Sequence, residues 1–256
     1  MRAKLNHLKK IRVGAVSYLN TKPLLFGIKQ EPFINQIELI EDYPAQIAQK
    51  LINDEIDVGL IPVAAILWLS ESSIVTEYCI GSDGAVASVC IFSEVPIQEV
   101  EKVYLDYQSR TSIELARILL DEYWKQKVEF VDAKGEDFRT EIKGGTAGVI
   151  IGDRALRQRK NSKYIYDLGE AWKKHTGLPF VFAAWVANKA LPAEFISLFN
   201  EANRAGLNQL MTVVEQNPFP GFDLKNYYEN CISYELDGEK RKGLDLFLQK
   251  LAALRR

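Results

Sequence analysis

A group of hydrogen-bonding side chains follows the first apolar segment of the chain. Residues 13–25 read VGAVSYLNTKPLL, and the polar members next to the apolar run are Ser17, Tyr18, Asn20 and Thr21. Hydroxyl and amide groups can bind a carboxylate or an alcohol, and ligands of α/β proteins bind at the carboxyl ends of strands. In the alternative interpretation, Ser17 or Asn20 caps a helix that continues through Pro23. Both interpretations are open at this point.

A second candidate is Ser88, which lies inside the apolar run VASVCIFS at residues 86–93. A buried hydroxyl needs a hydrogen-bond partner, which is either a neighbouring loop or a ligand. We favour a ligand contact, because this run is one of two that we expect to connect the halves of the molecule.

A third group, Ser109, Arg110, Thr111 and Ser112, precedes an amphipathic helical pattern. Hydroxyls and backbone N–H groups at the start of a helix form a site for an anion. Arg110 could add a fork for a carboxylate, or it could point to solvent. Glu114 lies three residues after Thr111 and completes a capping-box pattern, so a well-capped helix is the alternative.

The fourth group follows the apolar run at residues 149–151, where the sequence continues with Gly152 and Asp153. Asp153 at this position is more typical of a helix cap than of a proton acceptor. His175 follows two lysines in WKKHTGLPF, which favours a charged helix end over a general base.

The composition excludes several classes of function. The 32 basic and 34 acidic residues give a net charge of −2, so no positive field would attract nucleic acid. The cysteines at positions 79, 90 and 231 form no CxxC pair, and the chain has two histidines. We therefore expect neither a metal site nor a redox site.

The N-terminal sequence MRAKLNHLKKIRVGAV is basic, but Lys9, Lys10 and Arg12 interrupt the apolar stretch that export requires. No run approaches the about 18 apolar residues of a membrane span. We therefore predict a cytoplasmic protein with no membrane partner.

Short β-prone runs alternate with amphipathic runs, which predicts an α/β fold with largely parallel strands. The predicted strands are 11–16, 37–40, 57–61, 74–80, 86–92, 102–105, 128–131, 147–151, 164–167 and 180–187. The predicted helices are 44–53, 111–124, 192–216 and 237–254.

Two long β-prone runs, at residues 86–93 and 180–188, suggest two lobes. If both runs cross between lobes, residues 1–92 and 188–256 form lobe 1, and residues 93–187 form an inserted lobe 2. This arrangement is typical of hinged binding folds, whose ligand lies in the cleft between the lobes.

Six motifs occur in order along the chain: SYLNTKPL, EIDVGLIPV, GSDGAVASVCIFS, SRTS, VIIGDRAL and YDLGEAWKKHTGLPFVFAAW. Together they resemble the chorismate dehydratase family of the futalosine route to menaquinone, and the resemblance extends over almost the whole chain. It implies the two-lobed fold of type 2 periplasmic binding proteins. A sister family, the 1,4-dihydroxy-6-naphthoate synthases, shares that fold but begins with a different N-terminal signature.

The resemblance implies that the protein removes water from chorismate to give 3-[(1-carboxyvinyl)oxy]benzoate without a cofactor. It places Ser17, Tyr18, Asn20 and Thr21 in one wall of the cleft, Ser88 on the hinge, and residues 109–112 with Gly152 on the second lobe. Asn20 would orient the leaving hydroxyl, and Ser88 would anchor a carboxylate or the ether oxygen. The base would be Asp153 or a carboxylate of the substrate itself, and we favour the substrate.

A protein that binds or senses a small carboxylate is the main alternative, because proteins of this fold commonly bind small molecules without changing them. The sequence leaves the oligomeric state open.

Overall fold

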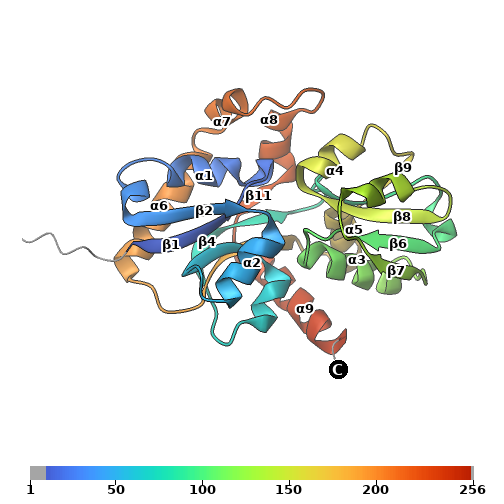
Figure 1. Ribbon diagram of the computed structural model, residues 1–256, viewed down its shortest axis with the longest axis horizontal. Coiled ribbons are helices and arrows are strands. Elements are labelled where there is room, and N and C mark those ends of the chain that lie inside the picture. Colours follow the sequence, from blue (N-terminus) through green and yellow to red (C-terminus); the bar gives the residue numbers. More distant parts are fainter. Residues whose placement is uncertain (1–9, 255–256) are drawn as a thin grey trace, which may run out of the picture.

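The computed structural model describes residues 10–254, which form two lobes, each built on its own β-sheet (Figure 1). The prediction of a two-lobed α/β fold is thereby confirmed. Most of the N-terminal segment from which we predict that no export signal is present lies outside the described residues, and so does His7. Within residues 10–254, no helix has the length and apolar character needed to cross a membrane.

Lobe 1 contains a six-stranded sheet in the order β11-β4-β10-β3-β1-β2. Its strands are β1 (Ile11–Val16), β2 (Ile37–Asp42), β3 (Val58–Pro62), β4 (Ser73–Ser82), β10 (Phe180–Ala187) and β11 (Ser233–Glu235). Strand β1 runs parallel to β2 and β3, whereas β10 is antiparallel to β3 and β4. The carboxyl end of β1, which leads into the polar segment, therefore emerges between β3 and the edge strand β2.

Lobe 2 contains a five-stranded sheet in the order β7-β6-β8-β5-β9. Its strands are β5 (Val89–Ser93), β6 (Lys102–Leu105), β7 (Glu129–Asp132), β8 (Thr146–Ile151) and β9 (Tyr164–Asp167). Its helices are α3 (Thr111–Glu122), α4 (Gly152–Gln158) and α5 (Leu168–Thr176). Strands β6 and β8 are parallel neighbours, so the segments that follow them, which lead into α3 and α4, lie at the same edge of the sheet.

The helices of lobe 1 are α1 (Lys22–Ile28), α2 (Pro44–Ile52), α6 (Ala193–Leu207), α7 (Leu210–Gln216), α8 (Leu224–Asn226) and α9 (Gly238–Leu254). Helices α1 and α6 touch backbone to backbone. A Cβ atom on Gly27 would lie 1.8 Å from the carbonyl oxygen of Ala202, and one on Gly206 would lie 2.0 Å from that of Pro23. Because only glycine permits this approach, α6 fixes the position of the helix that follows the polar segment.

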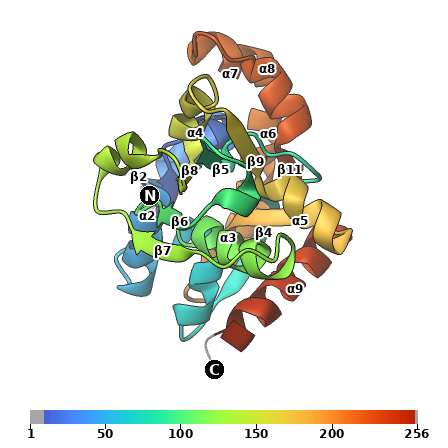
Figure 2. The same cartoon turned by 90° about the vertical axis from the view of Figure 1, so that its right-hand side faces the viewer.

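The C-terminal helix α9 packs on β10 of lobe 1 and also contacts α3 of lobe 2 (Figure 2). Lys250 on α9 forms a salt bridge with Glu122 at the end of α3, and His175 contacts the same carboxylate at 3.0 Å. His175 thus lies at a charged helix end, as the sequence indicates.

The predicted lobe boundaries are wrong in detail. Strand β10, at residues 180–187, pairs on both sides within the sheet of lobe 1, and β5, at residues 89–93, pairs on both sides within the sheet of lobe 2. The chain passes between the lobes at residues 83–88 and 177–179, just before each of these strands. The β-propensity of the two runs reflects their complete burial in one sheet each, and the passages themselves are short loops.

Candidate functional site

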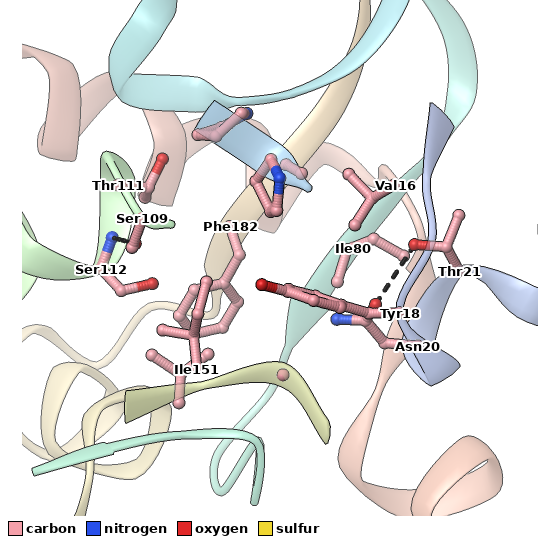
Figure 3. Close-up of a pocket in the computed structure, with 15 residues that line it drawn as sticks. Val16, Tyr18, Asn20, Thr21, Ile80, Ser109, Thr111, Ser112, Ile151 and Phe182 are labelled. Atoms are coloured by element: carbon pink, nitrogen blue, oxygen red, sulfur yellow. Dashed lines mark hydrogen bonds between the residues drawn. The ribbon is translucent and has the colours of Figure 1, made fainter. Parts of the chain in front are cut away.

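A cavity lies between the two lobes and holds about 430 Å³ of empty space, part of it open to solvent (Figure 3). It is lined by Val16, Tyr18, Asn20, Thr21, Pro44, Pro62, Ile80, Val89, Ser109, Thr111, Ser112, Ile151, Gly152, Phe182 and Ala183. The apolar residues come mainly from strands, and the polar residues come from the segment after β1 and from the start of α3. Residues far apart in the sequence thus form one site where the lobes meet.

Tyr18 and Gly152 form a tight contact across the cleft. Gly152 has a φ of +65°, and a Cβ atom at this position would lie 2.7 Å from the ring of Tyr18. The Tyr18 hydroxyl donates a hydrogen bond to Oε1 of Gln108 on lobe 2. Burial raises the pKa of Tyr18 above its ordinary value, so the phenol stays a neutral donor.

Asn20 and Thr21 lie in a single 3₁₀ turn, Leu19–Thr21, between β1 and α1. The Thr21 hydroxyl donates to Oδ1 of Asn20 at 3.2 Å. This bond leaves the Asn20 amide nitrogen as the donor on the cavity side (Figure 3). The helix-cap alternative is excluded, because the cap residue of α1 is Thr21 and no side chain caps that helix.

Ser17 is exposed and does not line the cavity, and its backbone N–H donates to the carbonyl of Asp42. The cavity lining therefore gives no support to a ligand contact of Ser17, which stays a prediction. Its side chain points away because alternate residues near a strand end face opposite sides of the sheet.

At the start of α3, ligand-facing and structural roles are divided among neighbouring residues. Ser109 Oγ accepts the backbone N–H of Ser112 at 3.1 Å and so satisfies one N–H group of the first turn of α3. Thr111 Oγ1 accepts the N–H of Ala64 in lobe 1 at 3.1 Å. The Ser112 hydroxyl points into the cavity (Figure 3). Ser112 is therefore the member of this group best placed to meet an anion.

Arg110 does not reach the cavity. Its guanidinium donates to Gln49 Oε1 at 3.1 Å and lies 5.1 Å from the centre of the Trp68 ring, both in lobe 1. Arg110 joins the two lobes through these contacts with Gln49 and Trp68, and the carboxylate fork stays a prediction.

Asp153 also joins the lobes. Its Oδ1 accepts the backbone N–H of Leu19 in lobe 1 at 2.9 Å, and it does not cap α4, which begins with no side-chain cap. The side chain is not part of the cavity lining. Burial raises the pKa of Asp153, and the hydrogen bond from Leu19 opposes this effect. Asp153 therefore follows the lining residue Gly152 in the sequence but does not itself line the cavity.

Ser88 is completely buried and does not line the cavity. Its hydroxyl accepts a hydrogen bond from the Tyr227 hydroxyl at 2.7 Å, and its carbonyl accepts the N–H of Gly152 at 2.8 Å. Ser88 lies in the passage between the lobes and its polar groups have protein partners in this structure, so a direct ligand contact stays a prediction. Its backbone still holds Gly152, which is in the lining.

The passage that carries Ser88 is held by a buried carboxylate. Asp167 accepts the backbone N–H groups of Val86 and Ala87 at 3.0 and 2.7 Å, and it also caps α5. Ala87 has a φ of +63°, a conformation that costs free energy in a residue with a side chain. Asp167 therefore fixes a strained hinge segment, a role that the sequence did not reveal.

The cavity is electrically neutral. Among the described residues that line it, none carries a carboxylate, imidazole, guanidinium or ammonium group. Arg154, near Tyr18, is occupied by ion pairs with Asp106 at 2.7 Å and Glu136 at 2.8 Å. A bound anion would thus meet hydroxyl and amide donors, and its own charges would be the strongest in the site.

Sequence reasoning missed part of the lining. Phe182 and Ile80 form an apolar wall on strands that were predicted correctly, but the face each side chain occupies was not assigned. The alternation of faces along a strand would place the neighbours Phe182 and Ala183 on opposite sides, yet both line the cavity, and β10 has a register shift between Val181 and Ala183.

A model of one family, described as menaquinone biosynthesis, matches residues 11–253. This chain belongs to the menaquinone biosynthesis family. Two curated relatives cover nearly all of it. The chorismate dehydratase of Thermus thermophilus is 26% identical, with 93% of this chain and 94% of the relative covered. The chorismate dehydratase of Campylobacter jejuni is 27% identical, with 94% and 97% covered.

The structure of this chain is also similar to solved structures. One is the Candida albicans CA3427 protein, described as having the generic periplasmic binding protein fold. It has a TM-score of 0.68 and 11% identity, with 97% of this chain and 92% of that chain covered. The predicted periplasmic-binding-protein-like fold is therefore confirmed.

Proposed function

We propose that this protein is a chorismate dehydratase, which eliminates water from chorismate to give 3-[(1-carboxyvinyl)oxy]benzoate. The observation that carries the proposal is the similarity to two chorismate dehydratases over 93 and 94% of the chain. The neutral interlobe cavity supports it, because a dicarboxylate with an apolar ring suits hydroxyl and amide donors beside apolar walls.

The reaction breaks two bonds on neighbouring ring carbons. The carbon that bears the ether oxygen loses its proton, the electron pair forms a ring double bond, and the hydroxyl of the adjacent carbon leaves and departs as water. The ring becomes aromatic, so the driving force resides in the product. The protein needs to supply orientation, a path for the proton and help for the leaving hydroxyl.

We assign the orientation to the two polar ends of the cavity. Ser112 and the first turn of α3 would hold one carboxylate, while Phe182, Ile80 and Val16 would pack against the ring. The Asn20 amide nitrogen would donate to the leaving hydroxyl. Tyr18, covering Gly152, would close the site from solvent.

A carboxylate of the substrate is the proton acceptor that we favour. The Asp153 carboxylate accepts from Leu19 and lies outside the lining. The described lining residues supply no other carboxylate or imidazole. A substrate carboxylate held beside the ring could take the proton and pass it to the leaving hydroxide.

The test is to incubate the purified protein with chorismate and to follow products by chromatography. We expect 3-[(1-carboxyvinyl)oxy]benzoate with the wild-type protein, and a rate lower by about 100-fold with Asn20→Ala, because a donor to the developing charge is lost. Saturable binding of chorismate without a new aromatic product would overturn the proposal in favour of a binding or sensor protein. Turnover of the substrate of the sister 1,4-dihydroxy-6-naphthoate synthases, with none of chorismate, would also overturn it.

A further inference from the structure

Three buried tyrosines from the C-terminal part of lobe 1 lie behind the cavity. Tyr227 and Tyr228 begin the π-helical turn Tyr227–Cys231, and Tyr234 is the middle residue of β11. All three are buried. None of them lines the cavity.

The three hydroxyls have different partners. The Tyr234 hydroxyl donates to the backbone carbonyl of Asn20 at 2.9 Å. The Tyr227 hydroxyl donates to Ser88, whereas the Tyr228 hydroxyl is buried with no hydrogen-bond partner among residues 10–254. Tyr234 is thus the member of this group that reaches the turn carrying the Asn20 amide.

The position of Tyr234 is fixed by the sheet. Ser233 and Glu235, on either side of it, pair with Gly81 and Tyr78 of β4. Burial raises the pKa of Tyr234 well above its ordinary value, so the hydroxyl remains a donor. Because β11 is held on the sheet, the bond restrains the Asn20 turn from outside the cavity.

The turn itself has few other restraints on the Asn20 side chain. Thr21 donates to Asn20 Oδ1, and this bond sets the rotation of the amide about its last side-chain bond. The bond from Tyr234 acts on the backbone of the same residue. Together the two bonds fix the position of the Asn20 backbone and the orientation of its side-chain amide.

We propose that Tyr234 is a positioning residue, which holds the Asn20 turn so that the amide nitrogen of Asn20 meets the leaving hydroxyl of the substrate. This inference rests on the proposed dehydratase function. It gives β11, an edge strand of the sheet, a role in the reaction, although no residue of β11 lines the cavity.

The variant Tyr234→Phe removes the hydroxyl and keeps the ring, and Tyr228→Phe is its matched control. We expect Tyr234→Phe to lower kcat for chorismate about tenfold, the effect of one lost hydrogen bond, with KM changed by less than about twofold. Tyr228→Phe should keep the wild-type kcat, since its hydroxyl has no partner to lose.

Combining Tyr234→Phe with Asn20→Ala separates positioning from a general structural role. If Tyr234 acts through Asn20, the same substitution should change kcat by less than about twofold when Asn20 is already alanine. Wild-type kcat in Tyr234→Phe, or an equal loss of kcat in both backgrounds, would overturn the proposal.

A wild-type protein that binds chorismate without converting it would refute the dehydratase function instead. In that case the positioning role, which is defined by the leaving hydroxyl, is refuted together with the reaction. Conversion of chorismate by the wild-type protein at a kcat that Tyr234→Phe leaves unchanged would refute the positioning role alone.

Discussion

The most direct prediction concerns Asp153, which could act as a general base or could hold the two lobes together through a hydrogen bond. Its carboxylate accepts the N–H of Leu19 at 2.9 Å, and Leu19 is 6% exposed. A hydrogen bond to a charged group contributes about 1.5–3 kcal/mol, and a neutral one about 1 kcal/mol. Asp153→Asn keeps an acceptor oxygen at this position, whereas Asp153→Ala leaves the buried N–H of Leu19 unpaired.

If Asp153 only joins the lobes, the loss should weaken closure around the substrate and should appear in KM. We expect Asp153→Asn to raise KM about fivefold, and Asp153→Ala to raise it roughly 10- to 100-fold, by the conversion of about 1.4 kcal/mol per factor of ten. In both variants kcat should stay within about threefold of wild type.

The assay is steady-state turnover of chorismate, with kcat and KM determined separately for both variants. A general base contributes about 10²–10⁴-fold to the rate. Normal binding of chorismate by Asp153→Asn, together with a fall in kcat of about 100-fold or more, would show that Asp153 takes the proton and would refute the assignment to a substrate carboxylate.

Two further predictions concern packing and pH. Gly152→Ala should raise KM at least about tenfold and lower the melting temperature, because the new Cβ atom would lie 2.7 Å from the Tyr18 ring at a φ of +65°; an unchanged KM would contradict the tight contact. Partial burial raises the pKa of Asp57, but hydrogen bonds from Arg12 and Lys189 outweigh it and hold the pKa below its ordinary value. The stability from this lowered pKa is present above the unfolded value of about 3.9 and is lost as the pH falls further. Thermal unfolding from pH 7 to pH 3 should therefore show a smaller loss of stability in Asp57→Asn than in wild type, and parallel curves would contradict this.

The sequence predicted the local elements closely. The predicted strands 11–16, 102–105, 164–167 and 180–187 have the same bounds as β1, β6, β9 and β10. Apolar periodicity and β-propensity are properties of short segments, so they can be recognised in the sequence without knowledge of the fold. The short strand β11 was missed, because three residues carry too little pattern. The predicted helix 192–216 is interrupted between α6 and α7.

The polar segments of the site were also predicted from the sequence, as was the family to which the chain belongs. Tyr18, Asn20, Thr21, Ser109, Thr111, Ser112 and Gly152 were expected to bind the ligand, and all of them line the cavity. Within lobe 2, the parallel strands β6 and β8 direct the start of α3 and Gly152 to one edge of their sheet, and the segment after β1 faces them from lobe 1.

Only the tertiary structure decided which polar groups face the cavity and which serve as internal partners. Asp153 contacts a residue 134 positions away, Ser88 one 139 positions away, and Tyr234 one 214 positions away. A polar side chain beside an apolar run needs a partner, and its local sequence does not distinguish a ligand from a distant N–H or hydroxyl. The packing of two lobes supplies that partner, and so it separates the residues that line the cleft from those that hold it in shape.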